Sequence, residues 1–289
     1  MLAHVPEQLR GRVFRGSRVV RDGVLTPRQL RSSAWRRLFP DVYAHADVPV
    51  DHALRARAAA SVLLPDAVVS GSSAAVLWGV DLVGPHDDVE LTRAAGTHPV
   101  RVPGLRVRRT DLHPDVVWCR AGVRVLTPEA SAASVAAALP PVDAVVALDR
   151  LVLSGVVELA AVRAAAGTLT GAGARRARTA AARADGLAQS PQETRLRLLL
   201  HASRLPRPIA QHRIRYGGRE IARVDFGWPE QRVAVEYDGL WHAEPGQFAR
   251  DRARLNRLTA AGWRIVFVTA ADLHAPEHLL ARIAAALAP

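Results

Sequence analysis

The sequence predicts an α+β protein with three parts: a small basic module, a middle domain that mixes helices and strands, and a C-terminal domain built on a mixed sheet. Short alternating apolar runs are interspersed with longer helical patterns, which is typical of several small sheets with helices between them. Near the C-terminus a helix is followed by three strands, a helix and a last strand. These patterns place the parts at residues 1–50, 51–170 and 190–289, with a linker at 171–189.

The first part is predicted to contain two short helices and a strand. Thr26 can cap the first helix and Pro27 suits its first position. The second helix is expected from the helical spacing of Trp35, Leu38 and Phe39. This order is typical of a winged helix, in which basic side chains hold phosphates while others reach base edges. The candidate nucleic-acid-binding residues are Arg28, Arg31, Arg36 and Arg37. A solvated basic face on an ordinary helical hairpin explains the same pattern.

The middle part is predicted to be a small mixed sheet flanked by helices. Strands are expected at residues 89–92, 100–102, 105–108 and 123–125, and helices at 51–64, 127–138, 142–154 and 159–166. Within residues 68–82, a Gly/Ser turn is expected to open an apolar helix that contains Trp78. The Ser70-Gly71-Ser72-Ser73 turn could cradle a phosphate, but an N-cap is the simpler interpretation. We find no convergent catalytic set in this part.

The linker, residues 171–189, is rich in Ala, Arg and Gly. Its arginines are most simply those of a solvated connecting helix, and contact with nucleic acid is the alternative. The last part then begins with a helix at 190–203. Three strands are expected at 211–216, 221–228 and 232–237, then a helix at 247–261, a strand at 263–269 and a closing helix. The last strand follows a helix, so we expect it to pair in parallel within a mixed sheet.

The basic residues of this chain are unusual because none is lysine. All 39 are arginine and the formal net charge is +12. Residues 1–60 carry 11 Arg against 5 acidic residues, residues 61–186 carry 13 against 12, and residues 187–289 carry 15 against 10. A genome rich in G and C would also favour arginine codons. The two basic ends nevertheless predict two surfaces that face a polyanion, most simply DNA.

Cysteine and hydropathy patterns indicate a cytoplasmic protein. Cys119 is the sole cysteine, so neither a disulfide within the chain nor a cysteine-based zinc site is expected. Residues 1–12 lack the apolar core of a signal peptide, and charged residues and prolines interrupt the Ala-rich stretch at 130–166. We therefore expect no membrane partner.

Three carboxylates and an imidazole gather in one predicted hairpin near the C-terminus. They are Asp225, Glu236, Asp238 and His242. Metal-dependent nucleases place two carboxylates on adjacent strands so that a hard cation between them polarises a phosphate and activates a water. Other interpretations are a pairing of Asp225 with Arg223 or Arg213, and a buried ion pair for Glu236.

The C-terminal hundred or so residues also resemble a known family. The matching residues are Ser190-Pro191-x-Glu193, Asp225-Phe226, Val235-Glu236-Tyr237-Asp238-Gly239, Trp241-His242, and Asp251 and Arg254 ahead of Gly262-Trp263. This pattern resembles the restriction-endonuclease-like PD-(D/E)XK superfamily, and within it the very-short-patch-repair endonucleases and similar domains at the C-termini of actinobacterial proteins. The resemblance implies a mixed-sheet endonuclease core.

The resemblance also implies roles for individual residues. Asp225 and Glu236 would be ligands of Mg²⁺, or of Mn²⁺ in its place, together with the backbone carbonyl of Tyr237. Asp238 occupies the position where the usual motif has lysine. His242 would substitute for that lysine as a general acid or base, although it lies one residue closer to the preceding glycine than in the repair enzymes.

Glu193 has two competing interpretations. In the family a helix glutamate approaches the metal, yet Ser190 and Glu193, with Pro191 at the first helical position, also form a complete capping-box pattern. Asp251 and Arg254 are expected to form an ion pair that supports the site.

The N-terminal 170 or so residues more faintly resemble actinobacterial proteins with a type IV, abortive-infection antitoxin-like domain. The residues that carry this likeness are Gly23-Val24-Leu25-Thr26-x-x-Gln29-Leu30 and Trp35-Arg36-Arg37-Leu38-Phe39-Pro40-x-Val42-Tyr43.

From the C-terminal resemblance we predict a magnesium-dependent endonuclease that hydrolyses DNA in defence or repair, with a homodimer required for double-strand cutting. The alternative is a DNA-binding regulator or antitoxin-like protein that carries an inactive nuclease fold.

Overall fold

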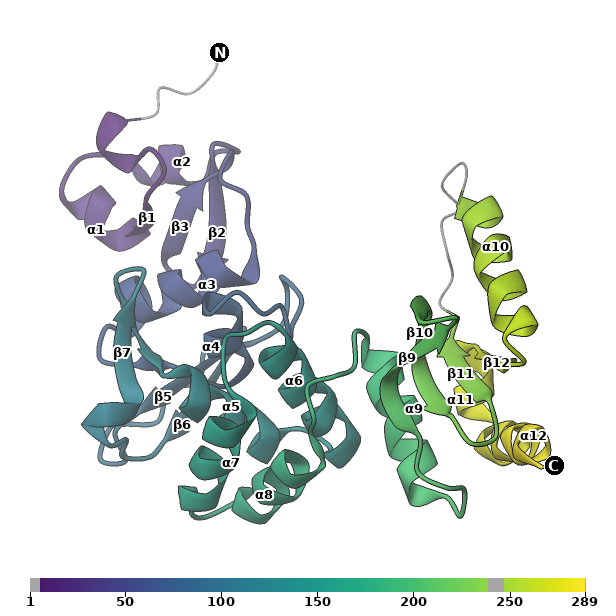
Figure 1. Cartoon of the computed structure of the whole chain (residues 1–289). Coiled ribbons are helices and arrows are strands. Elements are labelled where there is room, and N and C mark those ends of the chain that lie inside the picture. Colours follow the sequence, from purple (N-terminus) through teal and green to yellow (C-terminus); the bar gives the residue numbers. More distant parts are fainter. Residues whose placement is uncertain (1–5, 239–246, 289) are drawn as a thin grey trace. The chain divides into compact units, whose positions relative to one another are not determined.

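The computed structural model describes residues 6–238 and 247–288, without the side chains of residues 247–249 and 251. Within these residues the protein is a mixed α/β structure whose strands form separate three-, four- and five-stranded sheets (Figure 1). The chain divides into two compact units. The first unit is Met1–Leu139 with Ser154–Ala182, and the second unit is Pro140–Leu153 with Arg183–Pro289.

The N-terminal segment of the first unit is a three-stranded sheet in the order β1-β3-β2 with short helices beside it. Thr26 caps the helix that begins at Pro27, as predicted, in a full capping box with Gln29; this helix is the second one in the structure. The elements are η1 (Glu7–Leu9), β1 (Val13–Arg15), α1 (Gly16–Arg21), α2 (Pro27–Leu30), β2 (Trp35–Phe39) and β3 (Val42–His45).

The prediction of a helix over Trp35, Leu38 and Phe39 is wrong, because these residues form strand β2. It pairs with β3 in an antiparallel hairpin, and Asp41 in the turn has a left-handed φ of 61°. The ring of Trp35 packs edge-on against Phe14 of β1, with centroids 5.1 Å apart. Trp35, Leu38 and Phe39 fit a helical period, but Arg36 and Arg37 separate them, and in so short a segment the cross-strand partners decide the structure.

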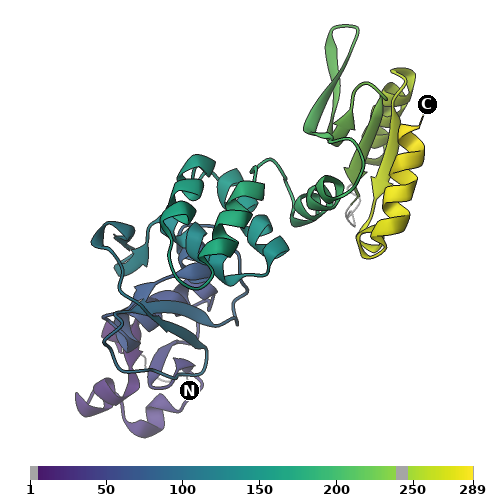
Figure 2. The ribbon, with the colours of Figure 1, turned by 90° about the horizontal axis from the view of Figure 1, so that it is seen from below.

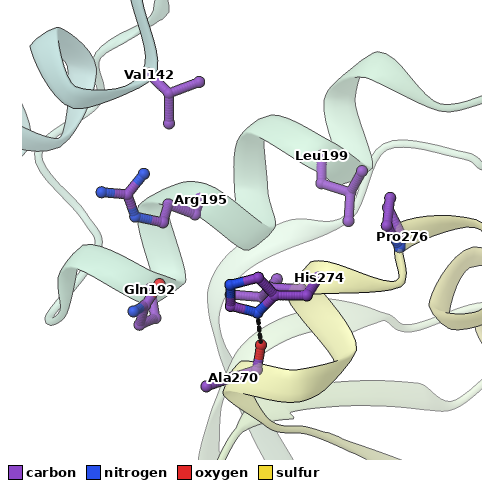
Figure 3. A pocket seen from close by; sticks show the side chains of 8 residues that line it. Val142, Gln192, Arg195, Leu199, Ala270, His274 and Pro276 are labelled. Atoms are coloured by element: carbon purple, nitrogen blue, oxygen red, sulfur yellow. Dashed lines mark hydrogen bonds between the residues drawn. The ribbon is translucent and has the colours of Figure 1, made fainter. Parts of the chain in front are cut away.

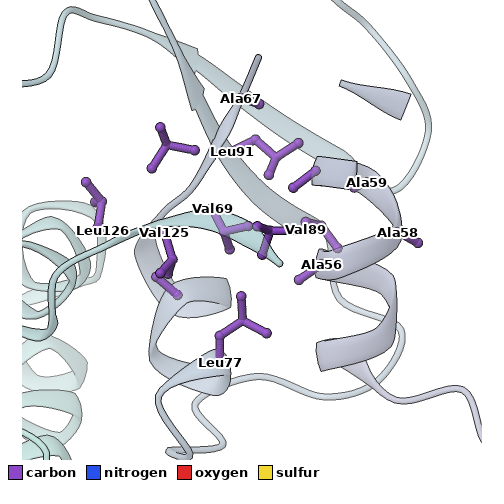
Figure 4. Close-up of a cluster of buried hydrophobic side chains, with 14 of the residues drawn as sticks. Ala56, Ala58, Ala59, Ala67, Val69, Leu77, Val89, Leu91, Val125 and Leu126 are labelled. Atoms are coloured by element: carbon purple, nitrogen blue, oxygen red, sulfur yellow. The ribbon is translucent and has the colours of Figure 1, made fainter. Parts of the chain in front are cut away.

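A five-stranded sheet in the order β6-β5-β4-β8-β7 forms the centre of the first unit. Figure 4 shows Val69, Leu91 and Val125 of this sheet in the buried cluster to which Leu77 of α4 also contributes. The elements are α3 (His52–Ala58), η2 (Ala59–Leu63), β4 (Val68–Val69), α4 (Gly71–Leu77), β5 (Val89–Arg93), β6 (Leu105–Arg109), η3 (Pro114–Val116), β7 (Val117–Arg120) and β8 (Val123–Leu126).

The predicted strands at 89–92, 105–108 and 123–125 correspond to β5, β6 and β8, whereas the strand predicted at 100–102 is wrong. Those residues precede a turn and have no strand partner. Strand β7 was not predicted, and it forms by antiparallel pairing with β8 at the sheet edge. The unit also contains helices α5 (Pro128–Ala138), α7 (Leu159–Thr168) and α8 (Ala174–Arg183), except that Arg183, the last residue of α8, belongs to the second unit.

The second unit contains a four-stranded sheet in the order β12-β11-β10-β9. β9, β10 and β11 form the predicted antiparallel meander, and β12 pairs with β11 in parallel, as predicted. The elements are α9 (Pro191–Ala202), β9 (Ile209–Tyr216), β10 (Arg219–Trp228), β11 (Val233–Tyr237), α10 (Gln247–Ala260), β12 (Arg264–Val268), α11 (Ala270–His274) and α12 (Pro276–Leu287).

Two apolar clusters cover the faces of this sheet. The α9/α12 cluster includes Leu196, Phe226, Val235 and Ile283. The α10 cluster is smaller and includes Ile214, Val224, Ala234 and Leu258. Alternate residues of β11 enter opposite clusters, as expected for a strand that is buried on both faces.

Helix α6 (Pro141–Leu153) belongs to the second unit, whereas the sequence placed this segment in the middle domain. Asp149 of α6 is fully buried and contacts α9 through Thr194, at 2.8 Å, and through Arg197, at 2.6 Å. The same carboxylate accepts the backbone N–H groups of Asp185 and Gly186. This network joins α6, part of the predicted linker and α9, which no local pattern could reveal.

Candidate active site on the C-terminal sheet

Asp225 and Glu236 lie beside one another on the antiparallel strands β10 and β11. Phe226 pairs with Val235, so the two carboxylate residues are the next ones along their strands, away from the connecting turn. The backbone N–H of Tyr237 donates a hydrogen bond of 2.8 Å to Asp225 Oδ2. The strand order thus brings the two carboxylates together as expected, and their chemical role stays a prediction.

The backbone around Asp225 is irregular. Val224 packs in the α10 cluster, whereas Phe226, two residues on, packs in the α9/α12 cluster. Residues two apart share a face in a regular strand, so β10 changes face at this point. On β9, Gln211 has a left-handed φ of 51° and no strand partner on β10. A non-glycine residue in this conformation costs free energy, and such residues concentrate at functional sites.

Glu236 is held by Arg254 of α10. Nη1 of Arg254 donates a hydrogen bond of 2.9 Å to Oε2 of Glu236, and Nη2 donates to Oε1. Nη2 also donates to the backbone carbonyl of Arg223, at 2.9 Å. The Glu236 side chain is 12% exposed, so this is a largely buried, two-pronged ion pair. Arg254 was predicted to support the site through Asp251, and its contact with Glu236 is more direct.

Glu193 is buried at the first turn of α9 and uses its carboxylate locally. Ser190 Oγ accepts the Glu193 backbone N–H at 3.2 Å, which is the predicted cap. In return, Glu193 Oε2 accepts the backbone N–H of Gln189 at 2.8 Å, one residue before the cap, and the side-chain amide of Gln211 at 3.2 Å. The reciprocal bond therefore differs from a standard capping box. The contact with Gln211 links α9 to the irregular part of β9.

The electrostatics of Asp225 reflect this crowding of carboxylates. The pKa of Asp225 is raised from 3.8 to about 6, mainly by burial and also by the negative charges of Glu193 and Glu236. The Tyr237 N–H and the Arg254 guanidinium act in the opposite direction. Two further carboxylates thus lie within electrostatic range of Asp225. A nearby cation would relieve their repulsion.

The other predicted site residues contribute less to this arrangement. Asp238 follows the end of β11 with an exposed side chain, and its backbone N–H donates to Val268 at 2.7 Å. His242 lies outside the described residues. Asp251 lies on α10, and its side chain is likewise outside the description. The alternative pairing of Asp225 with Arg213 is not found, because Arg213 pairs with Glu220 at 3.0 Å.

The donors at this site are of the right kind for a hard cation. Carboxylate oxygens of Asp225 and Glu236 and the carbonyl of Tyr237 are the ligands that Mg²⁺ prefers. Among the described residues, however, no three His, Cys, Asp or Glu side chains form a ready-made metal cluster. A cation would therefore have to compete with Arg254 for Glu236.

A separate pocket lies on the second unit between α6, α9 and the α11–α12 region (Figure 3). Gln192, Arg195 and His274 line it together with apolar side chains, and Nδ1 of His274 is 2.8 Å from the carbonyl of Ala270 in its own helix. Glu193, Asp225 and Glu236 are not among the lining residues. This pocket is therefore not the predicted metal site.

The predicted nucleic-acid-binding arginines are all exposed, but they do not share one helix. Arg28 lies on α2 and Arg31 caps its C-terminus. Arg36 and Arg37 lie on strand β2, where the sequence predicted a helix and turn. Adjacent strand residues point to opposite faces, so these two cannot form one recognition surface of the kind a helix presents.

Sequence reasoning missed Gln211, and it offered a buried ion pair for Glu236 as an alternative without naming Arg254 as the partner. Gln211 belongs to no recognisable sequence motif. It matters because it lies on β9, the strand next to Asp225, and donates a hydrogen bond to Glu193. Arg254 was singled out only through the family resemblance. Both contacts join residues far apart in the sequence, at separations that no periodic pattern encodes.

Comparisons with known proteins add relatives without an assigned activity. No family model matches the chain. Two curated relatives from Mycobacterium tuberculosis, the uncharacterized proteins MT2308 and Rv2248, are each 43% identical over 103 residues, which is 35% of this chain and 38% of the relative. The chain thus matches little more than a third of their length.

A solved structure, that of the RV2827C protein from Mycobacterium tuberculosis, covers 71% of this chain and 84% of its own, with 14% identity and a TM-score of 0.39. A match at that level carries no argument about function. Within the described residues, no helix is long and apolar enough to cross a membrane.

Proposed function

We propose that the second unit is a metal-dependent nuclease domain of the PD-(D/E)XK type that hydrolyses phosphodiester bonds of DNA. The observation that carries this proposal is the placement of Asp225 and Glu236 side by side on adjacent strands, with the carboxylate of Glu193 in electrostatic range. Buried like charges of this kind are costly unless a cation neutralises them. Mg²⁺, or Mn²⁺ in its place, is the cation that suits these ligands.

The residues of the site divide into holding and positioning roles. Asp225, Glu236 and the carbonyl of Tyr237 would hold the metal ion, which when bound supplies Lewis-acid polarisation of the phosphate and an activated water. The Tyr237 N–H orients Asp225 through its 2.8 Å hydrogen bond. Glu193 and Gln211 keep the first turn of α9 next to the irregular strand.

Arg254 offers a positive charge in a chain without lysine. If a cation binds Glu236, the guanidinium is released from that carboxylate while its contact with the Arg223 carbonyl keeps it at the site. It could then bind the negative charge that develops on the phosphate. His242 remains the proposed general acid or base, and Asp238, a carboxylate, cannot stabilise the developing phosphate charge as a lysine does.

The N-terminal segment is proposed to be a winged-helix module that contributes DNA binding. Its order of strand, two helices and two strands, with β1 paired to β3, supports this assignment. Arg28 and Arg31 lie at the second helix, where phosphate contacts are expected. A cytoplasmic location, an antitoxin-like first unit and a homodimer belong to the same proposal.

A plasmid-nicking assay tests the nuclease activity. Cleavage is expected with Mg²⁺ or Mn²⁺ and not with EDTA, and Asp225→Asn and Glu236→Gln are each expected to reduce it by about 10² or more, since each removes a ligand of the metal. Glu230→Gln, an exposed carboxylate in the turn between the same strands, is the matched control. Cleavage that survives both site substitutions would refute the mechanism.

A second candidate function is a DNA-binding regulator whose nuclease fold is inactive. The two-pronged Glu236–Arg254 ion pair favours it, because this pair already neutralises one proposed ligand without any metal. Duplex binding that is independent of metal and strongly dependent on salt, without nicking, would support this alternative.

A further inference from the structure

The hairpin of β9 and β10 extends well past its neighbour in the sheet. β10 pairs with β11 over Phe226–Trp228, whereas its pairing with β9 continues to the turn at Gly217 and Gly218. Figure 2 shows the hairpin as a long green ribbon that projects beyond the other strands of its sheet. Both glycines have positive φ, 56° and 79°, as a tight two-residue hairpin turn requires. The projecting part is therefore a two-stranded ribbon with a well-defined turn.

The two faces of this ribbon differ in chemistry. One face buries Ile214, Ala222 and Val224 in the α10 cluster. The opposite face carries exposed charged residues, here called the arginine face: Arg213, Arg215, Glu220 and Arg223. Since the apolar face already anchors the ribbon to the unit, the arginine face is available for a partner.

The charges on the arginine face are arranged unfavourably for an isolated protein. Arg213 lies directly opposite Arg223 in the register, and like charges at such positions destabilise a strand pair. Glu220 pairs with Arg213 at 3.0 Å, and the two side chains are 37% and 65% exposed. One carboxylate against three guanidinium groups leaves an excess of positive charge. Arg219 and the 60%-exposed Tyr216 form the last pair before the turn, on the face that also carries Ile214.

We propose that the arginine face is a binding arm for the phosphate backbone of duplex DNA. A two-stranded ribbon is of a size to enter or follow the major groove, and arginine forks onto phosphate oxygens. Arg223 precedes Asp225 by two residues on one strand, a separation of about 7 Å. DNA that lies along the ribbon would therefore pass next to the candidate site. Duplex DNA is also the substrate of the proposed nuclease, but its binding to the arginine face does not require that cleavage occurs.

Binding of a labelled duplex by fluorescence anisotropy, in EDTA and over a range of salt concentrations, tests this arm separately from catalysis. The variant Arg215→Gln/Arg223→Gln is expected to flatten the plot of log affinity against log salt by about 2, because each lost phosphate contact removes about 0.9 from the slope. The matched control, Arg232→Gln/Arg257→Gln, removes the same charge from exposed arginines of the unit that lie off the hairpin. It is expected to retain the parent slope.

Three results would overturn the proposal. Equal slopes for the parent and the hairpin variant would show that no phosphate contact is made there. An equal decrease in salt slope in the hairpin variant and in the control would show that the effect depends on net charge and not on the position of the arginines. Binding of poly-glutamate that matches duplex binding in strength and in sensitivity to the hairpin variant would assign the face to an acidic protein segment. Matching circular dichroism spectra and melting temperatures establish that each variant is folded.

Discussion

At the scale of single residues, the carboxylates around Asp225 determine how the site responds to protons and metal ions. Asp225 is ionised only at a cost, because it is buried next to Glu193 and Glu236. Glu236 is compensated by Arg254. The site thus contains one carboxylate that is satisfied and one that is not, and substitutions at the two should affect stability in opposite directions.

Asp225→Asn is expected to stabilise the metal-free protein above about pH 6. The folded pKa of about 6 exceeds the usual 3.8, so the folded state binds this proton more tightly and is penalised when the proton leaves. The gain should be on the order of 1–3 kcal/mol near neutral pH and should vanish as the pH falls below 3.8. Thermal melts in EDTA across this range measure it.

Asp238→Asn is the control for that experiment, because it removes the same charge from an exposed side chain. Asparagine at position 225 can still accept the Tyr237 N–H, so the comparison isolates the charge. A destabilising effect of Asp225→Asn at neutral pH would contradict the assignment.

Arg254→Met is expected to destabilise the protein by about 2–4 kcal/mol in EDTA, because it leaves the Glu236 carboxylate largely buried without its partner. Added Mg²⁺ should recover part of the loss by binding the folded state. Chemical denaturation with and without metal measures both effects. In the double variant Glu236→Gln/Arg254→Met the metal response should weaken, because only Asp225 and the Tyr237 carbonyl remain as proposed ligands, and an undiminished response would exclude Glu236 as a ligand.

At the scale of secondary-structure elements, the first turn of α9 is tied to both the helix cap and the sheet. Ser190 caps the helix, whereas Glu193 reaches Gln189 and Gln211. The same residue types would be present in a purely structural capping box. The bond to Gln211 of β9 is what connects the helix to the strand irregularity next to Asp225.

Ser190→Ala and Glu193→Gln should therefore separate the cap from the site. Loss of the cap in Ser190→Ala should cost about 1 kcal/mol and leave nuclease activity nearly unchanged. Glu193→Gln retains an acceptor for Gln189 but removes a charge near Asp225, so its main expected effect is on the metal dependence of activity. Urea denaturation and a Mg²⁺ titration of nicking measure the two effects. Equal behaviour of both variants would assign Glu193 to capping alone.

At the scale of the whole molecule, the buried Asp149 determines that helix α6 belongs to the second unit. Its carboxylate accepts two backbone N–H groups, the Thr194 hydroxyl and the Arg197 guanidinium, and through them α6 joins the unit that contains the candidate site. Arg197 also pairs with Asp185 at 3.0 Å, which ties in the segment before α9.

Asp149→Ala is expected to destabilise the second unit by about 3–5 kcal/mol, because Arg197, with 3% of its side chain exposed, would lose its closest carboxylate. Limited proteolysis should then cut near residues 183–187 more rapidly. Asp143 lies on α6, as Asp149 does, and forms a half-exposed ion pair with Arg195 of α9. Asp143→Ala removes this pair and should cost less than about 1 kcal/mol of stability. Similar losses in the two variants would contradict the importance of the buried network.

The sequence by itself determined those features that depend on neighbours along the chain. The alternating runs predicted β9, β10 and β11 as a meander, the helix before the last strand predicted its parallel pairing, and the strand order predicted that Asp225 and Glu236 would meet. These predictions were confirmed because period, turn residues and connection length act locally.

Only the tertiary structure decided which partners each residue acquired. It made Trp35–Phe39 a strand, moved α6 to the second unit, paired Glu236 with Arg254 and placed Gln211 in a left-handed conformation beside Glu193. The physical reason is the same in each case. Cross-strand packing and buried ion pairs join residues distant in sequence, and their free energies exceed the weak local preferences that a sequence pattern records.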